Sequence, residues 1–255
     1  MVLLDPVTMS APIGKTTASQ SSKPKDGETP TLAVRTIASS QAQIMRHVHS
    51  VLLLSSFLMR FSTLVADPVS AMSNSVPIVA VIQAVYAIIC LPAAGSHVAK
   101  PAKKLRPGEK RKAGSDSTGP NVAVTTLVAL VLSTITTLAL HTVLVLFGAP
   151  FLTHVPHTFL CSIHLALLGL FPLFYTRGVS NKDWLEILSA RAPFDEAFGG
   201  LMGTCIGAWL GAVPIPLDWD REWQKWPVTI LCGMYGGYLV GKLIGGTIAF
   251  GKRLG

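Results

Sequence analysis

The sequence contains little charge: Asp, Glu, Lys and Arg together make up 13% of its 255 residues, whereas hydrophobic residues make up 50%. Soluble globular domains carry about 25% charged residues, so this composition excludes an ordinary water-soluble fold. The first 43 residues also lack a hydrophobic stretch followed by a small-residue cleavage site, and we expect no signal peptide to be removed from them. The composition that remains is typical of an integral membrane protein.

Cysteine and the short motifs of catalysis are scarce as well. The four cysteines, Cys90, Cys161, Cys205 and Cys232, all lie within apolar stretches and form no CxxC or Cys/His spacing. This pattern excludes a zinc site and a disulfide framework, and it favours reduced cysteines that pack in the interior. No HExxH, P-loop, dinucleotide-binding or Ser/His/Asp pattern occurs either. We therefore expect no metal, no cofactor and no complete active site in this chain.

The apolar residues are collected into six segments that approach or reach the roughly 20 residues needed to cross a bilayer as a helix. Residues 1–43, rich in Ser, Thr, Pro and Lys, are predicted to be a disordered cytoplasmic tail, and residues 98–120 a basic cytoplasmic linker. The predicted fold is all-α: a polytopic membrane protein with a bundle of about six transmembrane helices over residues 44–255. The segments are 46–66, 75–97, 121–148, 156–176, 197–214 and 227–249.

Basic residues are concentrated on one side of the predicted spans. The formal net charge is +8, but the basic residues lie between and outside the apolar segments, which favours a membrane surface over nucleic acid as their partner. Counted by alternate sides, 17 Lys and Arg residues fall with the two termini, and only Arg221 and Lys225 fall on the opposite side. The positive-inside rule then predicts that both termini are cytoplasmic and that the loop containing Arg221 faces the lumen or the exterior.

Two basic residues fall inside predicted spans, where an ionisable side chain is by default a candidate for function. Arg60 lies about two helical turns from the lumenal end of its segment, and Lys242 about two turns from the cytoplasmic end of its own. Two interpretations are open for each of them. Either the side chain snorkels to the headgroup layer, or it binds a lipid phosphate or an acidic residue of a partner.

Glycines recur every four residues in the last two segments. Residues four apart lie on one side of a helix, so each run forms a face without side chains, against which another backbone can pack closely. Such faces are a main source of van der Waals contact between helices in lipid. They serve either to pack the fifth helix against the sixth or to dock a transmembrane helix of a partner protein. The glycines are Gly199, Gly203, Gly207 and Gly211 in the fifth segment and Gly233, Gly237, Gly241 and Gly245 in the sixth.

The connection PLDWDREWQKWP, residues 216–227, is rich in tryptophan and charge. If it is helical, its three tryptophans share one face after an aspartate N-cap and form an interfacial anchor. Alternatively, the connection is a lumenal docking surface for a partner or for lipid headgroups. A third alternative, a cation held by its acids, lacks the nucleophile and the further carboxylates of a phosphoryl-transfer centre. The candidate residues are Pro216, Asp218, Trp219, Asp220, Arg221, Trp223, Trp226 and Pro227.

The run GAWLGAVPIPLDWDREWQKWP, residues 207–227, resembles the PIG-F family of glycosylphosphatidylinositol (GPI) anchor biosynthesis proteins, known in fungi as GPI eleven. The run VLFGAPFLTHVPHTFLCSIHLALLGLFPLFYT, residues 145–176, is similar to the family's pattern as well. With the six-span layout, the resemblance covers roughly residues 45–250. It implies a multi-pass protein of the endoplasmic-reticulum membrane.

The resemblance also implies a function without catalysis. Family members bind and stabilise the larger, multispan ethanolamine-phosphate transferases, which move phosphoethanolamine from phosphatidylethanolamine to mannoses of the GPI precursor. The expected function is therefore that of a non-enzymatic accessory subunit, with transferase subunits and membrane lipids as its partners. The alternative is an independent lipid transferase or lipid-moving protein, in which Asp218, Asp220, Arg221 and Lys242 handle a phosphorylated headgroup. The two functions differ in whether the chain alone acts on lipid.

Overall fold

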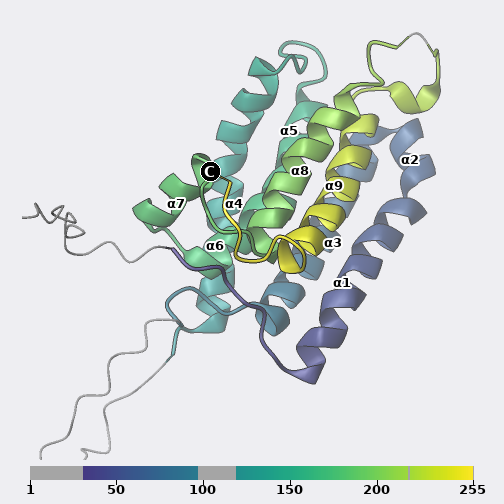
Figure 1. The fold of residues 1–255 in the computed structure, drawn as a ribbon. Helices are drawn as coiled ribbons and strands as arrows, with labels where there is room; N and C mark the ends of the chain where they lie inside the picture. Colours follow the sequence, from purple (N-terminus) through teal and green to yellow (C-terminus); the bar gives the residue numbers. More distant parts are fainter. Residues whose placement is uncertain (1–30, 97–118, 218, 255) are drawn as a thin grey trace, which may run out of the picture. The chain divides into compact units, whose positions relative to one another are not determined.

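The computed structural model of the protein describes residues 31–96, 119–217 and 219–254. The predicted tail up to residue 30 and nearly all of the predicted linker lie outside these residues. The described part of the unit Thr31–Gly255 consists of helices and loops without a strand, so the all-α prediction is confirmed there (Figure 1). The helices are α1 (Ser40–Met59), α2 (Phe61–Ala66), α3 (Pro68–Cys90), α4 (Val122–Leu146), α5 (Val155–Leu165), η1 (Ala166–Leu170), α6 (Phe171–Arg177), α7 (Asn181–Leu188), α8 (Glu196–Ala212), η2 (Glu222–Gln224) and α9 (Val228–Gly246).

Short polar side chains set where the first helices begin. Ser39 accepts a hydrogen bond from the backbone N–H of Ala42 at the start of α1. Asp67 caps α3 in the same way, and hydrogen bonds from the side chain and the backbone N–H of Ser70 hold the pKa of the Asp67 carboxyl below its usual value. With this cap and Pro68 in the first turn, α3 begins several residues before the apolar segment predicted from residue 75.

Four helices of the described residues are long and apolar enough to cross a membrane, which confirms the membrane-protein class. They are Pro68–Cys90, Val122–Leu146, Val155–Arg177 and Val228–Gly246. The predicted number of six spans is not confirmed by the described residues. Neither α1 nor α8 is among the four. Helix α8 is short, with 17 residues, and α1 carries Arg46, His47 and His49 in its first half.

The most enclosed of these helices is Val155–Arg177, and 83% of its most apolar stretch is buried. It consists of α5, the π-helical turn η1 and α6 in unbroken succession. A π-helical turn is a local widening of an α-helix. Here the turn contains Gly169, where an added Cβ would lie 2.7 Å from the side chain of Leu201 in α8. Because α3, α4 and α8 all contact this helix, it forms the centre around which they pack.

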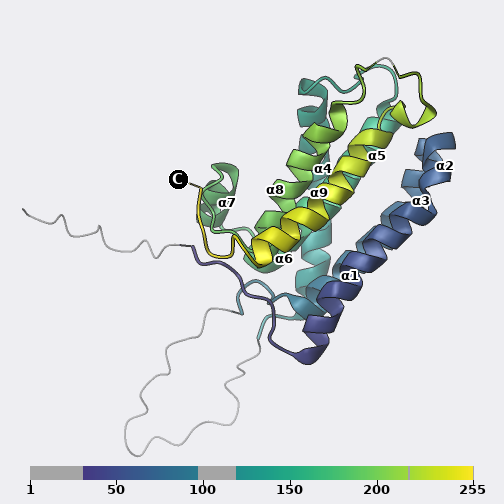
Figure 2. The ribbon, with the colours of Figure 1, turned by 45° about the vertical axis from the view of Figure 1, so that its right-hand side comes forward.

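Helices α8 and α9 form an antiparallel hairpin. The two helices lie side by side in both ribbon views, and their contact is more extensive than that of any other two described helices (Figures 1 and 2). The main hydrophobic cluster joins α9 to α1, α3 and α5 through Met234, Leu53, Met72 and Leu165. Helix α8 also contacts η1 and α6, so both helices of the hairpin attach it to the rest of the described unit.

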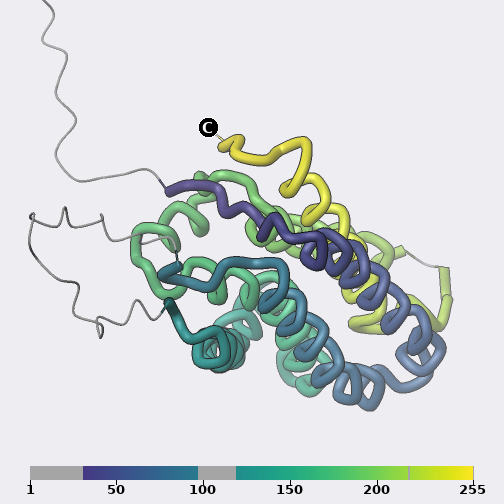
Figure 3. The backbone as a smooth tube through the Cα atoms, turned by 90° about the horizontal axis from the view of Figure 1, so that it is seen from below, coloured from purple at the N-terminus to yellow at the C-terminus, as the bar shows by residue number. Residues whose placement is uncertain are grey.

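Residues 31–38, which the sequence assigned to the tail, are bound to one end of the helical unit. The backbone N–H of Ile37 donates to the carbonyl of Cys90, at 2.8 Å, and Arg253 donates to the carbonyl of Thr31, at 2.6 Å. In Figure 3 this segment, in purple, crosses the ends of the helices. The difference from the prediction arises because partners for these backbone groups come from residues distant in sequence, which composition does not reveal.

Candidate functional site

All eight ladder glycines lie in the contact between α8 and α9 and are called the glycine seam below. A Cβ atom added to Gly207 would meet the backbone carbonyl of Gly233, and one added to Gly233 would meet the carbonyl of Gly207. The two helices therefore approach each other backbone to backbone, which only glycine allows. Further along the seam, Gly203 faces Gly237 and Gly241, Gly199 faces Gly241 and Gly245, and Gly211 faces Thr229 and Ile230.

The seam is thus internal, as in the first of the two alternatives that the spacing left open. A partner helix could use these glycines only if α8 and α9 separated.

Three further glycines of these two helices have different surroundings. Gly200 lies against the ring of Tyr238 and Gly246 against Glu196, whereas no atom lies within 4 Å of a Cβ added to Gly236. Packing within the described chain therefore gives no reason for a glycine at position 236.

The hairpin has an inner and an outer face. In α9, Tyr238 and Lys242, which each follow a seam glycine, are buried, whereas Gly236 and Val240, which each precede one, are exposed. This difference follows from helix geometry, because neighbouring residues point about 100° apart at 3.6 residues per turn. The exposed residues beside the seam are called the hairpin outer face. They are Ile206 and Leu210 of α8 and Gly236, Val240 and Ile244 of α9.

Lys242, on the inner face, is only 3% exposed. Its ammonium group donates to Nδ1 of His49, at 2.8 Å, and to the carbonyl of Arg46, at 3.3 Å. It also lies 3.9 Å from the centre of the Tyr86 ring. Snorkelling is therefore wrong for Lys242, because its charge has partners on α1 and α3 inside the protein. To reach a lipid phosphate or a partner protein, the side chain would have to leave them.

His49 adds further hydrogen bonds between the same three helices. Because an ammonium group can only donate, His49 accepts at Nδ1 and carries its proton on Nε2. Nε2 then donates to Oε1 of Gln83, at 3.3 Å, and the hydroxyl of Tyr238 donates to the same oxygen, also at 3.3 Å. The imidazole stacks on the Tyr86 ring with 4.1 Å between centroids. These contacts fix the tautomer of His49 and connect α1, α3 and α9.

Glu196, the first residue of α8, supplies the negative charge among these groups. Its Oε1 pairs with Arg46, and its Oε2 accepts a hydrogen bond from the hydroxyl of Tyr86 at 2.5 Å and lies 4.0 Å from Nζ of Lys242. Gly246 leaves room for this carboxylate, since a Cβ there would lie 2.6 Å from Cγ of Glu196. We call the following seven residues the buried charge network: Arg46, His49, Gln83, Tyr86, Glu196, Tyr238 and Lys242.

A second buried ion pair lies next to the network. Nη2 of Arg177, the last residue of α6, is 2.5 Å from Oδ2 of Asp195, and both side chains are at most 2% exposed. The other oxygen of Asp195 caps α8 by accepting from the backbone N–H of Phe198, at 2.9 Å. Neighbouring acids at the start of α8 therefore bind cations from three other helices. A buried charge is costly unless it is paired, so both acids contribute to the placement of α8.

The loop 213–227 differs from its prediction. Within the part that the structure describes, only Glu222–Gln224 form a helical turn, so the predicted interfacial helix is wrong. The Gln224 amide satisfies the backbone in another way: its nitrogen donates to the carbonyls of Pro214 and Leu217, and its oxygen accepts from the N–H of Arg221. Side-chain bonds of this kind compete with helix formation.

The tryptophans of this loop do not share one environment. Trp226 is half-buried, and its Nε1 donates to the hydroxyl of Thr158, at 3.2 Å. Trp223 packs against the main hydrophobic cluster, whereas Trp219 is 52% exposed and contacts only the edge of Trp223 among the rings described. The loop is thus tied to α5 at one tryptophan and open at another. Of the other motif residues, Pro227 is buried, Pro216, Asp220 and Arg221 are exposed, and Asp218 lies outside the described residues.

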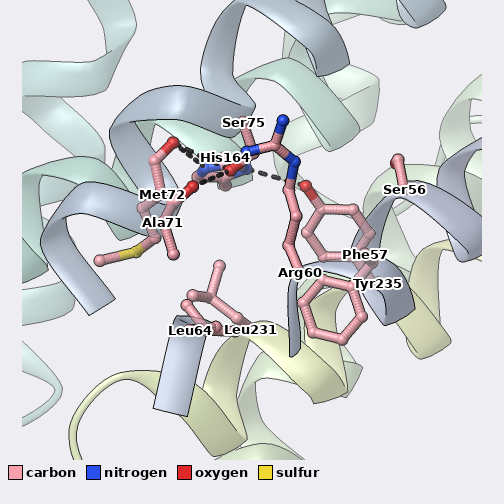
Figure 4. Close-up of a pocket in the computed structure, with 10 residues that line it drawn as sticks. All are labelled: Ser56, Phe57, Arg60, Leu64, Ala71, Met72, Ser75, His164, Leu231 and Tyr235. Atoms are coloured by element: carbon pink, nitrogen blue, oxygen red, sulfur yellow. Dashed lines mark hydrogen bonds between the residues drawn. The ribbon is translucent and has the colours of Figure 1, made fainter. Parts of the chain in front are cut away.

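Arg60 lies apart from the buried charge network. It ends α1, is half-buried, and lines a cavity of about 20 Å³ between α1, α3, α5 and α9 (Figure 4). Ser56, Ser75 and His164 contribute polar groups to the same cavity. Within the described residues, the guanidinium group makes no ion pair and no hydrogen bond. Both interpretations of Arg60, snorkelling and anion binding, are compatible with this position.

The sequence pattern singled out Lys242 but missed its partners. His49 and Gln83 lie within predicted spans, so the rule that marks polar residues in a membrane helix as functional could have found them. Glu196 stands one residue before the predicted segment 197–214 and was therefore counted with a loop. No group of three His, Cys, Asp or Glu side chains that could hold a metal ion occurs in residues 31–96, 119–217 and 219–254.

Long apolar helices joined by internal charges define an all-α integral membrane protein. The chain belongs to the GPI biosynthesis protein family Pig-F, whose family model matches residues 48–246. The family membership predicted from two short runs of sequence is thereby confirmed.

The chain is similar to two fungal proteins over nearly its whole length. Glycosylphosphatidylinositol anchor biosynthesis protein 11 of Neurospora crassa is 50% identical, over 99% of this chain and 100% of its own length. The protein of the same name in Pyricularia oryzae is 47% identical, over 97% of this chain and 96% of its own. The human GPI ethanolamine phosphate transferase, stabilizing subunit, is 38% identical over 41% of this chain and 49% of its own length. No solved structure matches the chain.

Proposed function

We propose that this chain is a non-catalytic accessory subunit that binds and stabilises an ethanolamine-phosphate transferase of GPI-anchor biosynthesis. The observation that carries the proposal is its family, together with the name of its human relative, the stabilizing subunit of such a transferase. The ion pairs support it: Lys242, Glu196 and Arg177 are engaged with one another or with neighbours inside the chain. Their part in the function is to fix the helices that a partner contacts.

The protein is proposed to act in the endoplasmic-reticulum membrane with both termini in the cytoplasm. The excess of basic residues, 17 on one side and two on the other, supports this orientation. The buried charge network then lies in the cytoplasmic half of the bilayer. The exposed residues Trp219, Asp220 and Arg221 face the lumen, where they are available to the lumenal part of the partner or to lipid headgroups.

The hairpin outer face is the proposed contact for a transmembrane helix of the transferase. Its side chains Ile206, Leu210 and Val240 are 52%, 54% and 56% exposed, and Gly236 among them leaves open space where a Cβ would be. In lipid, helices associate largely through close van der Waals packing, which a small residue on an exposed face permits. The seam keeps the two helices of this face in fixed positions.

A Gly236→Leu variant is expected to fold normally and to lose most of the transferase that co-purifies with the wild type. A Cβ at this position has no atom of the described residues within 4 Å, but the new side chain would push a docked helix away, at a cost of about 1–3 kcal/mol of association free energy. The measurement is affinity purification from gently solubilised membranes, with quantitative mass spectrometry of the recovered proteins.

The matched control is Leu127→Phe on α4, which enlarges a side chain that is 63% exposed on a helix outside the hairpin. We expect this variant to recover as much transferase as the wild type. Undiminished recovery with folded Gly236→Leu would rule out the hairpin outer face as the contact. Recovery of the wild-type chain without any transferase, combined with transfer or flipping of phospholipid by the purified chain, would favour an independent lipid-handling function.

A further inference from the structure

The guanidinium group of Arg60 is the starting point, because Arg60 lies in a predicted span and no carboxylate of the described residues pairs with it. Three other cations within helices, Arg46, Arg177 and Lys242, each have a carboxylate within 4.0 Å. Arg60 has none among the described residues, and its half-buried position limits its access to water. A charge in this position is stable only if an anion or water meets it.

The cavity beside Arg60 has a polar rim and a closed floor. The rim consists of the half-buried residues Ser56 and Arg60 from α1 and Ser75 from α3. On the floor, the two nitrogens of His164 are already paired, Nδ1 with the hydroxyl of Tyr235 at 2.9 Å and Nε2 with a backbone carbonyl at 3.3 Å. Figure 4 shows the guanidinium group close to Ser75 and above His164. The unpaired donor is therefore at the rim and not on the floor.

The surface around this rim is apolar. Leu54, Leu58 and Met59, which flank the rim residues on α1, are 43%, 58% and 83% exposed. Exposed side chains of this kind face lipid in a membrane helix. The rim hydroxyls donate to carbonyls of their own helices, Ser56 to Leu53 at 2.9 Å and Ser75 to Ala71 at 2.8 Å. Since a hydroxyl rotates freely, each can turn to an incoming acceptor.

The depth of Arg60 suits the phosphate layer of a bilayer. Arg60 precedes Asp67, the exposed cap in the turn between α2 and α3, by seven residues, which corresponds to about 10 Å along a helix. A long arginine side chain covers much of such a distance by snorkelling. The guanidinium group can thus meet a headgroup phosphate from a backbone position inside the hydrocarbon layer.

We propose that Arg60, Ser56 and Ser75 form a binding site for the phosphate diester of a glycerophospholipid. The planar guanidinium fork donates to two phosphate oxygens, and the hydroxyls donate to the same group. The cavity, with room for about one water molecule, is too small to admit a headgroup, so the phosphate sits at the rim and the acyl chains follow the apolar surface of α1. This site would be present whether or not the chain binds a transferase.

The test uses two probes with the same acyl chains, dioleoyl phosphatidylethanolamine and dioleoylglycerol, which lacks the phosphate. Each is titrated into the full chain in detergent, and bound lipid is measured by native mass spectrometry. For the phospholipid we expect Arg60→Gln to raise the dissociation constant about tenfold, a loss typical of a charge-assisted contact. Arg60→Lys, which keeps the charge without the fork, should fall between the two. Dioleoylglycerol should bind equally to all three proteins.

The matched control is Lys225→Gln, which removes an exposed cation from the loop after α8. It should bind the phospholipid as the wild type does. An equal loss in Lys225→Gln and Arg60→Gln, or no loss in a folded Arg60→Gln protein, would overturn the proposal. Binding of inorganic phosphate that depends on Arg60, without binding of the phospholipid, would assign the site to a soluble anion instead. Unchanged lipid binding with reduced recovery of a partner protein would assign Arg60 to that partner.

Discussion

A Gly207→Leu variant is expected to lose the folded hairpin and most of its yield of monodisperse protein. The Cβ of the added side chain would overlap the backbone carbonyl oxygen of Gly233. A backbone atom cannot move aside as the end of a flexible side chain can. Overpacking of a core costs about 1–3 kcal/mol and occasionally more, and here the two helices would also lose the contacts along the rest of the seam. Size-exclusion chromatography and the midpoint of thermal unfolding in detergent measure the effect.

Gly236→Leu serves as the matched comparison for this prediction. It is the same substitution on the same hairpin, immediately before the seam residue Gly237, but its side chain would enter open space. We expect its yield and unfolding midpoint to match those of the wild type. Equal destabilisation of both variants would contradict the close approach of α8 and α9, because the loss would then come from helix propensity or insertion.

A Glu196→Gln variant is expected to be destabilised by about 3 kcal/mol or more, the usual cost of removing one partner from a buried ion pair. Glutamine keeps the size and a hydrogen-bond acceptor for Tyr86, but it removes the charge that faces Arg46 and Lys242. Most of the lost stability is expected to come from Lys242, because its side chain is only 4% exposed and would be left as an unpaired buried cation. The side chain of Arg46 is 27% exposed and can turn to water. Thermal unfolding in detergent measures the change.

The double variant Glu196→Gln/Lys242→Met provides the control. Methionine removes the buried cation while it keeps an unbranched chain of similar length, so part of the lost stability should return. The coupling between the two substitutions is then the difference between the double variant and the sum of the single ones. If Glu196→Gln is as stable as the wild type, or if Lys242→Met on that background destabilises further, the carboxylate does not hold this cation.

Helix positions are the part of the structure that the sequence predicts best. The segment 121–148 corresponds to Val122–Leu146, and 156–176 to Val155–Arg177. Prediction and structure agree for both segments, because an uninterrupted apolar run can form all its backbone hydrogen bonds in lipid only as a helix. The prediction for the loop 213–227 was wrong because the spacing of its tryptophans was interpreted as one face of a helix. In the structure the Gln224 side chain donates to backbone carbonyls of the loop, which in a helix would be bonded within the backbone.

The candidate site was only partly visible in the sequence. The glycine spacing predicts a close helix contact from i, i+4 geometry alone, but two ladders that face each other look the same in sequence as two that face outward. Lys242 was recognised as an intramembrane charge, while its ion-pair partner Glu196 is 46 residues earlier in the chain and just outside a predicted span. Pairing across such a distance depends on how helices pack, which a local pattern does not contain.

The amino-acid sequence by itself determined the membrane class, the positions of the long helices and the family, because hydrophobic length, backbone satisfaction and short motifs are local properties. Only the tertiary structure decided that the glycine seam is internal, that Lys242 is buried beside His49 and Glu196, and that no carboxylate of the described residues pairs with Arg60. These three outcomes depend on which helix faces lie against each other. The pairing of helix faces is the one that leaves the least unpaired charge and gives the closest contact over all the helices together. It therefore depends on the packing of the whole unit and not on any single segment.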